Sequence, residues 1–150
     1  MTPQDVSYTC PQCELALWQP IARLTCSTLG LYDDVRFPGR CLLVFHKHVE
    51  DFAALDSQDT LAFIEDAKRA ARAIQAATKA PRINYAILGN AEPHLHFHLV
   101  PRLDAEDPVP GKSPWNHPDE ATPLPAATRE KLVAKIAAHI AGASAVSSIL

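Results

Sequence analysis

The sequence predicts an α+β domain, in which an antiparallel sheet packs with two helices. Two observations carry this prediction. Helical patterns occur near the middle and the end of the chain, and short apolar runs bounded by turn residues lie around the first of them. The chain has 150 residues and a hydrophobic content of 47%. Because this is enough for one buried core but not for two ordinary domains, we expect residues 1–150 to form a single domain.

The predicted strands are short runs of apolar and β-branched residues. They are residues 21–28 (one strand or two), Cys41–Phe45, Ile83–Leu88 and His94–Val100. Gly89 and Asn90 form a strong turn signal after the third of these runs. The last run is expected to end at Pro101, because proline has no N–H to donate to a neighbouring strand.

The predicted helices span Ser57–Lys79 and about Ala126–Ala141. In both, apolar residues recur at helical spacing. Asp56 or Ser57 can cap the first helix, and Pro81 ends it. Gly142 is the expected stop for the second. Between the last strand and the second helix, residues 104–125 are rich in proline and polar residues and are expected to form a loop anchored by Trp115.

Charge and hydropathy exclude several classes of partner. The net charge is −3, so no global positive field attracts a nucleic acid polymer or an anionic membrane surface. No apolar run has the length of a bilayer-spanning helix, and residues 1–9 lack the pattern of a secretory signal, so we expect a cytoplasmic protein. Thiols stay reduced there, and the four cysteines are expected to be metal ligands or core thiols.

The most informative segment is His94–Val100, in which histidine alternates with apolar residues. Side chains on a strand alternate between its faces, so His94, His96 and His98 are expected to project from one face. At a rise of roughly 3.3 Å per residue, neighbouring histidines on that face would lie about 6.5–7 Å apart. The sequence therefore predicts a track of three imidazoles on a rigid element.

Two chemistries use such a track. Histidines two residues apart on a strand can converge on a metal ion. Alternatively, a neutral imidazole, which is abundant at pH 7, can attack phosphorus and form a phosphoramidate that water later cleaves. Flanking imidazoles can then donate hydrogen bonds to the phosphoryl oxygens. The spacing alone does not choose between the two.

The segment His94–Val100 resembles the motif of the histidine-triad (HIT) superfamily, His-h-His-h-His-h-h, where h is apolar. With Phe37-Pro38-Gly39 and His48-Val49, the chain is similar to bacterial HIT proteins described as diadenosine tetraphosphate hydrolase-like. The resemblance runs from about Cys10 to Trp115. It implies a half-barrel, with an antiparallel sheet of about five strands and two helices, that forms a homodimer.

The resemblance also implies an activity. A nucleotidyl hydrolase would cleave a dinucleoside polyphosphate or a nucleoside phosphoramidate through a covalent nucleotidyl-histidine, without a metal in the chemistry. His96 matches the nucleophile and His98 a phosphate contact, with His94 completing the catalytic set. Two alternatives stay open, namely a nucleotide-binding module with little turnover and a zinc-dependent hydrolase.

The same resemblance assigns residues that contact the nucleotide. The position that binds the ribose hydroxyls falls on Asp33, with Asp34 as the neighbouring alternative. Asn84 and Asn90 match polar positions that contact the phosphates. The chain departs from some relatives at Ala91, where they carry a serine, so it lacks one phosphate donor.

A lone Cys-x-x-Cys pair, Cys10 and Cys13, is a weak metal signal by itself. HIT proteins with this pair resemble zinc proteins whose other ligands match His48 and His94, with His46 as a competing candidate. Two thiolates and two imidazoles would close a tetrahedral structural Zn²⁺ site and leave no position open for catalysis.

Overall fold

A computed structural model describes residues 6–103 and 105–147, and it confirms the α+β prediction. Five strands form one antiparallel sheet in the order β1-β2-β3-β5-β4. The strands are β1 (Pro20–Arg23), β2 (Ser27–Leu31), β3 (Cys41–Phe45), β4 (Arg82–Ala86) and β5 (His96–Arg102). The helices are α1 (Ser57–Thr78), α2 (Ala126–Ser147) and two 3₁₀ turns, η1 (Phe52–Ala54) and η2 (Pro114–Asn116).

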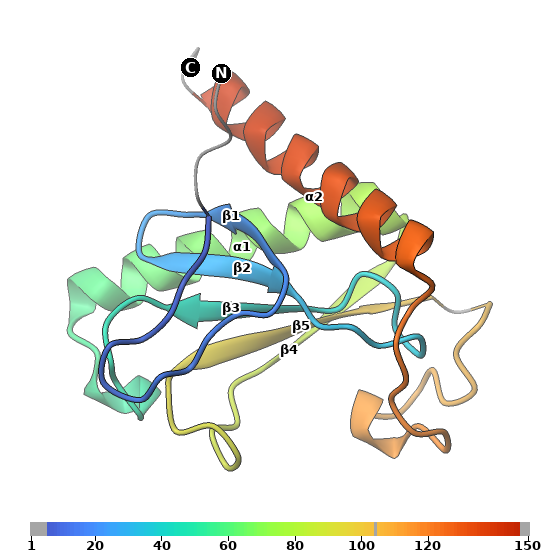
Figure 1. The fold of residues 1–150 in the computed structure, drawn as a ribbon, viewed down its shortest axis with the longest axis horizontal. Coiled ribbons are helices and arrows are strands. Elements are labelled where there is room, and N and C mark those ends of the chain that lie inside the picture. Colours follow the sequence, from blue (N-terminus) through green and yellow to red (C-terminus); the bar gives the residue numbers. More distant parts are fainter. Residues whose placement is uncertain (1–5, 104, 148–150) are drawn as a thin grey trace.

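Both long helices lie on the same side of the sheet, and this side holds the core (Figure 1). Helix α1 contacts β2, β3, β4 and β5, whereas α2 packs on α1 and β1. The central contact is aromatic: the ring of Phe63 lies 5.1 Å from that of Phe45 and 5.0 Å from that of Phe97. Because Phe97 points into this core, its neighbours His96 and His98 must face the other side of the sheet. Neither helix combines the length and apolarity that crossing a bilayer requires, within the residues described.

The N-terminal segment runs across the side of the sheet opposite the helices before it enters β1 (Figure 1). The Tyr8 hydroxyl donates a hydrogen bond to the carbonyl of His46 at 2.9 Å. Leu17 lies so close to Gly30 of β2 that a Cβ atom there would be 2.8 Å from its Cδ2 atom. This glycine therefore lets the segment pack tightly, and the packing brings Cys10 and Cys13 toward β5.

Helix α1 begins and ends nearly as its sequence predicts. Asp56 is the N-cap, and its carboxylate accepts a hydrogen bond from the Asp59 amide at 2.7 Å. Lys79 closes the helix in the left-handed region, with φ of 62°. Pro81 follows two residues later, as expected for a residue that cannot continue a helix.

Several strand boundaries differ from the prediction. Residues 21–28 are parts of two strands, and β4 ends at Ala86 rather than at Leu88. Strand β5 begins only at His96 and continues through Pro101 to Arg102. Pairing with β3 stops at Leu99, so the last residues of β5 have a partner only in β4. A proline is tolerated there for the same reason that it is tolerated on an edge strand.

The second helix is longer than predicted. It continues through Gly142 to Ser147, instead of ending near Ala141. Glycine ends a helix when it takes a left-handed φ, and the described glycines with positive φ are Gly39 and Gly89. Gly142 therefore costs the helix some stability without ending it.

Candidate functional site

Two of the three predicted imidazoles form a close pair. The rings of His96 and His98 have centroids 4.9 Å apart in an edge-to-face arrangement, and their Nε2 atoms lie 3.2 Å apart. Adjacent positions on one face of a strand are about 6.5–7 Å apart at the backbone, so the two rings lean toward each other. The two Nε2 atoms therefore lie at one place, instead of at two separate positions along the strand.

The proton on His96 can be located from its contacts. Its Nδ1 lies 2.6 Å from the backbone carbonyl of His94, and a carbonyl only accepts hydrogen bonds. The Nδ1 atom therefore carries the hydrogen, and the Nε2 atom of the neutral ring carries a lone pair. His96 is 6% exposed, so little of its surface meets solvent.

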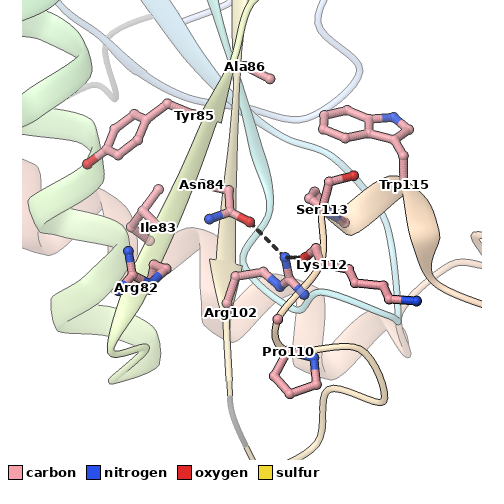
Figure 2. Close-up of a pocket in the computed structure, with 12 residues that line it drawn as sticks. Arg82, Ile83, Asn84, Tyr85, Ala86, Arg102, Pro110, Lys112, Ser113 and Trp115 are labelled. Atoms are coloured by element: carbon pink, nitrogen blue, oxygen red, sulfur yellow. Dashed lines mark hydrogen bonds between the residues drawn. The ribbon is translucent and has the colours of Figure 1, made fainter.

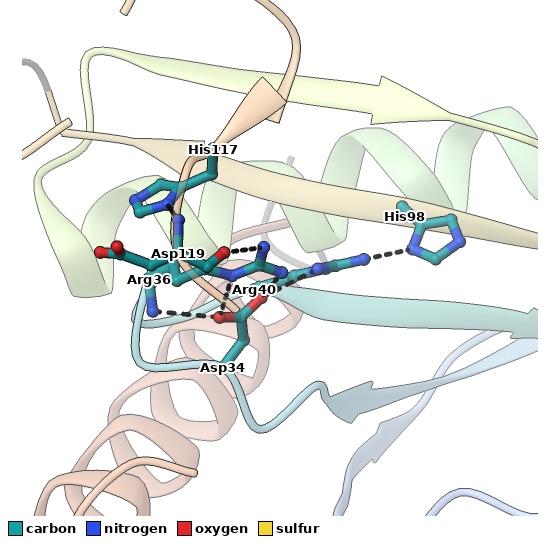
Figure 3. A network of polar contacts seen from close by, with 6 residues as sticks. All are labelled: Asp34, Arg36, Arg40, His98, His117 and Asp119. Carbon is teal, nitrogen blue, oxygen red and sulfur yellow. Dashed lines mark hydrogen bonds and ion pairs between the residues drawn. The ribbon is translucent and has the colours of Figure 1, made fainter. Parts of the chain in front are cut away.

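His98 is kept neutral by its surroundings. Burial, the nearby Arg40 guanidinium and the His96 ring lower the pKa of His98 from 6.5 to about 4. Arg40 places Nη2 at 3.1 Å from His98 Nδ1 (Figure 3). The indole of Trp115 packs edge-on against the ring, with centroids 5.4 Å apart.

His94 departs from the predicted track. It precedes the first residue of β5, and both of its ring nitrogens are engaged away from His96 and His98. Its Nε2 lies 2.6 Å from the carbonyl of Phe45, and its Nδ1 lies 3.4 Å from Cys13 Sγ. Its backbone carbonyl, rather than its ring, is what contacts His96. Leu95 lies in the core with Phe97 and Leu99, so the alternation continues through His94, although the ladder between β3 and β5 stops at the pair formed by Val44 and His96.

The histidine pair opens into a cavity of about 450 Å³. Its walls combine an apolar part with the two histidines, a cation and the turn after β4. The lining residues are Leu15, Tyr32, Arg40, Leu42, Leu88, Gly89, Asn90, Ala91, Glu92, His96, His98 and Trp115. Of the predicted nucleotide contacts, Asn90 lines this cavity. Trp115, predicted as a loop anchor, is 49% exposed and borders it, whereas the adjacent Pro114 is buried.

The four predicted metal ligands come together. The ligand atoms of Cys10, Cys13, His48 and His94 all lie within 4.8 Å of one another. Cys10 Sγ lies 3.7 Å from His48 Nδ1, and Cys13 Sγ lies 3.4 Å from His94 Nδ1. The competing candidate, His46, is instead bound through Nε2 to the Thr28 hydroxyl at 2.8 Å.

The pKa of one thiol of the cluster, that of Cys10, is lowered. Burial would raise the pKa of Cys10, but hydrogen bonds from the backbone amides of Cys13 and Gln12, and from the side chains of Cys13 and His48, lower it to about 6. A thiolate is the form of cysteine that binds metals. Cys41, in contrast, is fully buried in β3, and burial raises its pKa far above the ordinary value.

The predicted ribose contact Asp33 and its alternative Asp34 both form polar contacts within the protein. Asp33 accepts hydrogen bonds from the Leu124 amide at 2.7 Å and from Arg129 at 3.2 Å. Asp34 is fully buried, with ion pairs to Arg36 at 2.8 Å and to Arg40 at 2.9 Å (Figure 3). Neither of them is among the described residues that line the histidine cavity.

Asn84 faces a second, open cavity of about 660 Å³, beside β4 and the loop that precedes η2 (Figure 2). Its side-chain oxygen accepts a hydrogen bond from Arg102 at 2.7 Å. Arg102 is buried and also bonds to the Asp107 carboxylate and to the carbonyls of Val109 and Lys112. This network fixes the loop that carries Trp115 against the end of β5.

Sequence reasoning missed Tyr32 and Arg40. The Arg40 guanidinium lies 3.9 Å from the centre of the Tyr32 ring and 5.6 Å from that of Trp115. Arg40 directly follows the Phe37-Pro38-Gly39 turn, but no local pattern indicates that its side chain reaches His98. That contact depends on the pairing of β3 with β5, which is non-local.

A family model, the HIT domain, matches residues 27–105. Among solved structures, a histidine-triad protein from Sinorhizobium meliloti is similar at a TM-score of 0.73, with 25% identity over 81% of this chain and 88% of that one. A zinc-bound histidine-triad family protein from Mycobacterium smegmatis is similar at a TM-score of 0.60, with 20% identity over 85% and 86% of the two chains.

The diadenosine triphosphate hydrolase of Plasmodium falciparum also shares the fold, at a TM-score of 0.62, with 14% identity over 94% of this chain and 88% of that one. No curated protein sequence matches the chain. The matched HIT model covers more than half of the chain, including β2 to β5 and the paired histidines. The chain is therefore a member of the histidine-triad (HIT) family, which includes nucleotide hydrolases.

Proposed function

We propose that this protein is a nucleotidyl hydrolase in which His96 is the nucleophile. The observation that carries the proposal is the hydrogen bond from His96 Nδ1 to the His94 carbonyl at 2.6 Å. Because Nδ1 holds the hydrogen, Nε2 carries the lone pair that attack requires, and His96 lines the cavity. The substrate would be a dinucleoside polyphosphate or a nucleoside phosphoramidate.

The reaction would take two steps. In the first, His96 Nε2 forms a bond to the α-phosphorus, and the bond from phosphorus to the leaving group breaks with its electron pair on that group. The positive charge that develops on the ring is stabilised by the His94 carbonyl. In the second step, water attacks phosphorus, the P–N bond breaks, and a nucleoside monophosphate and neutral His96 are regenerated. The proton of the water leaves to solvent.

The cavity suggests how the substrate would lie. The apolar wall made by Leu15, Leu42 and Leu88 suits a nucleobase, and the phosphates would lie at the polar end with Asn90 and the histidine pair. His98 would donate a hydrogen bond to a phosphoryl oxygen. The neutral state of His98 leaves it one ring N–H for that purpose.

We also propose a structural Zn²⁺ at the four-residue cluster. Typical Zn–S and Zn–N distances in a tetrahedron place sulfur and nitrogen about 3.6 Å apart. The two pairs across the cluster are separated by 3.4 and 3.7 Å, so the donors suit the ion. His94 Nε2, which bonds to the Phe45 carbonyl, would leave Nδ1 bare for the metal, as is usual for zinc-bound histidines. The ion would link the N-terminal segment to the start of β5.

A homodimer and a cytoplasmic location complete the proposal. Strand β4 is an edge of the sheet, so its outer backbone groups are available for pairing with a second copy. Its Tyr85 is 53% exposed. Size-exclusion chromatography with light scattering would test the dimer, and a monomer at all concentrations would exclude it. Zinc binding requires Cys10 and Cys13 to be reduced, and the cytoplasm is a compartment that keeps thiols reduced.

Hydrolysis assays of the wild type and a His96→Asn variant test the proposed activity. The panel contains dinucleoside polyphosphates and nucleoside phosphoramidates, with His117→Asn as a control at a histidine outside the cavity. We expect His96→Asn to abolish turnover while nucleotide binding, measured by calorimetry, persists. Normal turnover by His96→Asn would exclude the mechanism. A wild type that binds nucleotide but hydrolyses none of the panel would favour the nucleotide-binding module.

A further inference from the structure

Arg40 is a buried cation held in one place by neighbours on three sides. Its Nη1 donates to the Asp34 carboxylate at 2.9 Å, and its guanidinium stacks 3.9 Å from the centre of the Tyr32 ring. Arg40 is only 5% exposed, although it lies at the wall of the histidine cavity. The third neighbour is His98, whose Nδ1 lies 3.1 Å from Arg40 Nη2.

The direction of the contact between Arg40 and His98 is fixed by chemistry. A guanidinium has five N–H donors, no acceptor, and does not lose its proton in proteins. Arg40 must therefore donate, and His98 Nδ1 must accept with its lone pair. A neutral imidazole that accepts at Nδ1 carries its hydrogen at Nε2, so Arg40 selects one of the two tautomers of His98.

The selected tautomer points its N–H at the reacting atom. His98 Nε2 lies 3.2 Å from His96 Nε2, where the His96 lone pair is located. In the free protein the His98 Nε2–H donates a hydrogen bond to this lone pair. A phosphoryl oxygen bound beside His96 would accept a hydrogen bond from the same N–H. In the other tautomer two lone pairs would face each other, and His98 would have no donor for the phosphate.

We propose that Arg40 is a positioning residue for the reaction at His96, because it fixes His98 as an Nε2–H donor and Asp34 holds it in place for that task. This inference rests on the proposed function for its effect on the rate. The tautomer itself is a property of the free protein and does not depend on any substrate.

A purely structural role does not account for Arg40. Its Nε is buried and meets no hydrogen-bond acceptor among the described residues, so the position that brings Nη2 to His98 leaves one donor of the guanidinium unsatisfied. The Asp34 carboxylate would also keep a partner without it, since Arg36 binds both carboxylate oxygens at 2.9 and 2.8 Å. Figure 3 shows this arrangement, in which Arg40 reaches His98 and Arg36 does not.

Two variants separate the roles. Arg40→Met removes the donor and keeps an unbranched side chain against Tyr32. Arg36→Met is the matched control, because it also removes a cation from Asp34 but has no contact with His98. The measurements are the ¹⁵N and ¹H NMR signals of the His98 ring in the free protein, together with kcat and KM for a dinucleoside polyphosphate.

We expect the Nε2–H tautomer of His98 in the wild type and in Arg36→Met, and its loss in Arg40→Met. The value of kcat should fall roughly 100-fold in Arg40→Met, as for the loss of one transition-state donor, with KM little changed. Arg40→Lys, which keeps a donor, should recover part of kcat.

Several results would overturn the inference. An Nδ1–H tautomer of His98 in the wild type would do so without any variant, even if Arg40→Met did not fold. A folded Arg40→Met with unchanged tautomer and kcat would do the same, and an effect on KM alone would make Arg40 a direct substrate contact. If the wild type hydrolyses nothing in the panel, the proposed function fails, but the tautomer measurement still decides whether Arg40 controls His98.

Discussion

The Nε2 atoms of His96 and His98 lie 3.2 Å apart, although the two residues belong to one short strand and each ring has its other nitrogen bound elsewhere. One ring is held by the backbone carbonyl of His94 and the other by the guanidinium of Arg40. The pair therefore behaves as a unit with one lone pair and one N–H facing each other. Placing a proton on either ring would bring a positive charge next to the other and, for His98, next to Arg40.

Acid is expected to destabilise the fold through His98. Its pKa is about 4 in the folded protein, against 6.5 for an exposed histidine, so between these values the unfolded chain binds more protons than the folded one. The contribution to stability is present above pH 6.5 and is lost as the pH falls toward 4. His46, whose pKa is also lowered by burial and by Arg23, adds in the same direction.

Urea unfolding from neutral pH down to about pH 4 would measure this dependence. In a His98→Asn variant, which does not titrate, the free energy of unfolding should fall less steeply over the same range. An identical slope in the variant and the wild type would show that His98 is not the responsible group.

Zinc binding should depend on His48 and not on its neighbour His46. The two residues are two positions apart, but His48 lies in the Cys/His cluster, whereas His46 binds Thr28. We expect purified wild type and His46→Gln to hold about one zinc ion per chain, and His48→Gln to bind zinc at least 10-fold more weakly. Metal analysis by mass spectrometry and chelator titration measure this, and equal zinc contents in the two variants would refute the ligand set.

Removing the metal should destabilise the protein and leave the chemistry intact. Chelation is expected to lower Tm, because a structural zinc site contributes to folding. Turnover per folded molecule should persist below the new Tm, since no step of the proposed reaction uses the ion. Loss of activity with the fold intact would instead support a zinc-dependent hydrolase.

Asp33 is expected to act on stability rather than on substrate binding. Its carboxylate holds the Leu124 amide and Arg129, which join the loop after β2 to the start of α2. Asp33→Asn should lower the free energy of unfolding by about 1 kcal/mol, as for one lost hydrogen bond, and leave KM unchanged. The ribose contact inferred from the resemblance makes the opposite prediction, an increase in KM with stability little changed.

The buried ion pair of Arg102 and Asp107 should be costly to break. Both side chains are almost fully buried, and Arg102 also bonds to Asn84. Asp107→Asn would leave the guanidinium charge buried without its counter-ion, and we expect a loss of about 3 kcal/mol in urea unfolding. The control is Glu65→Gln in the exposed pair with Lys68, for which the loss should stay below about 1 kcal/mol. Similar small losses in both variants would contradict the assigned role.

Local signals in the sequence were sufficient for the elements and for part of the site. The cap at Asp56 and the helical apolar spacing located α1 closely, and the apolar run Cys41–Phe45 is a buried strand with the predicted bounds. The alternation of histidine with Leu95, Phe97 and Leu99 placed His96 and His98 on the face away from the core. Such patterns succeed because each depends only on neighbours a few residues away.

The features that were missed depend on contacts between distant segments. The ladder between β3 and β5 ends at Val44 and His96, and the His94 ring just outside it meets Cys13, which is 81 residues away in the chain. Arg40, in the turn just before β3, reaches His98 from 58 positions away. Contacts between residues so far apart in the chain produce no periodic pattern in the sequence. Predicting them would have required the pairing of β3 with β5.

The account as a whole depends on a covalent bond between His96 and a nucleotide. The most direct test is to mix the protein with a dinucleoside polyphosphate, quench with base within one turnover, and measure the intact mass and the modified peptide. We predict an adduct of one nucleotidyl group that is stable to base, labile to acid and located on His96, and absent from His96→Asn. Turnover with no such adduct at any time, or an adduct located on another residue, would contradict the account.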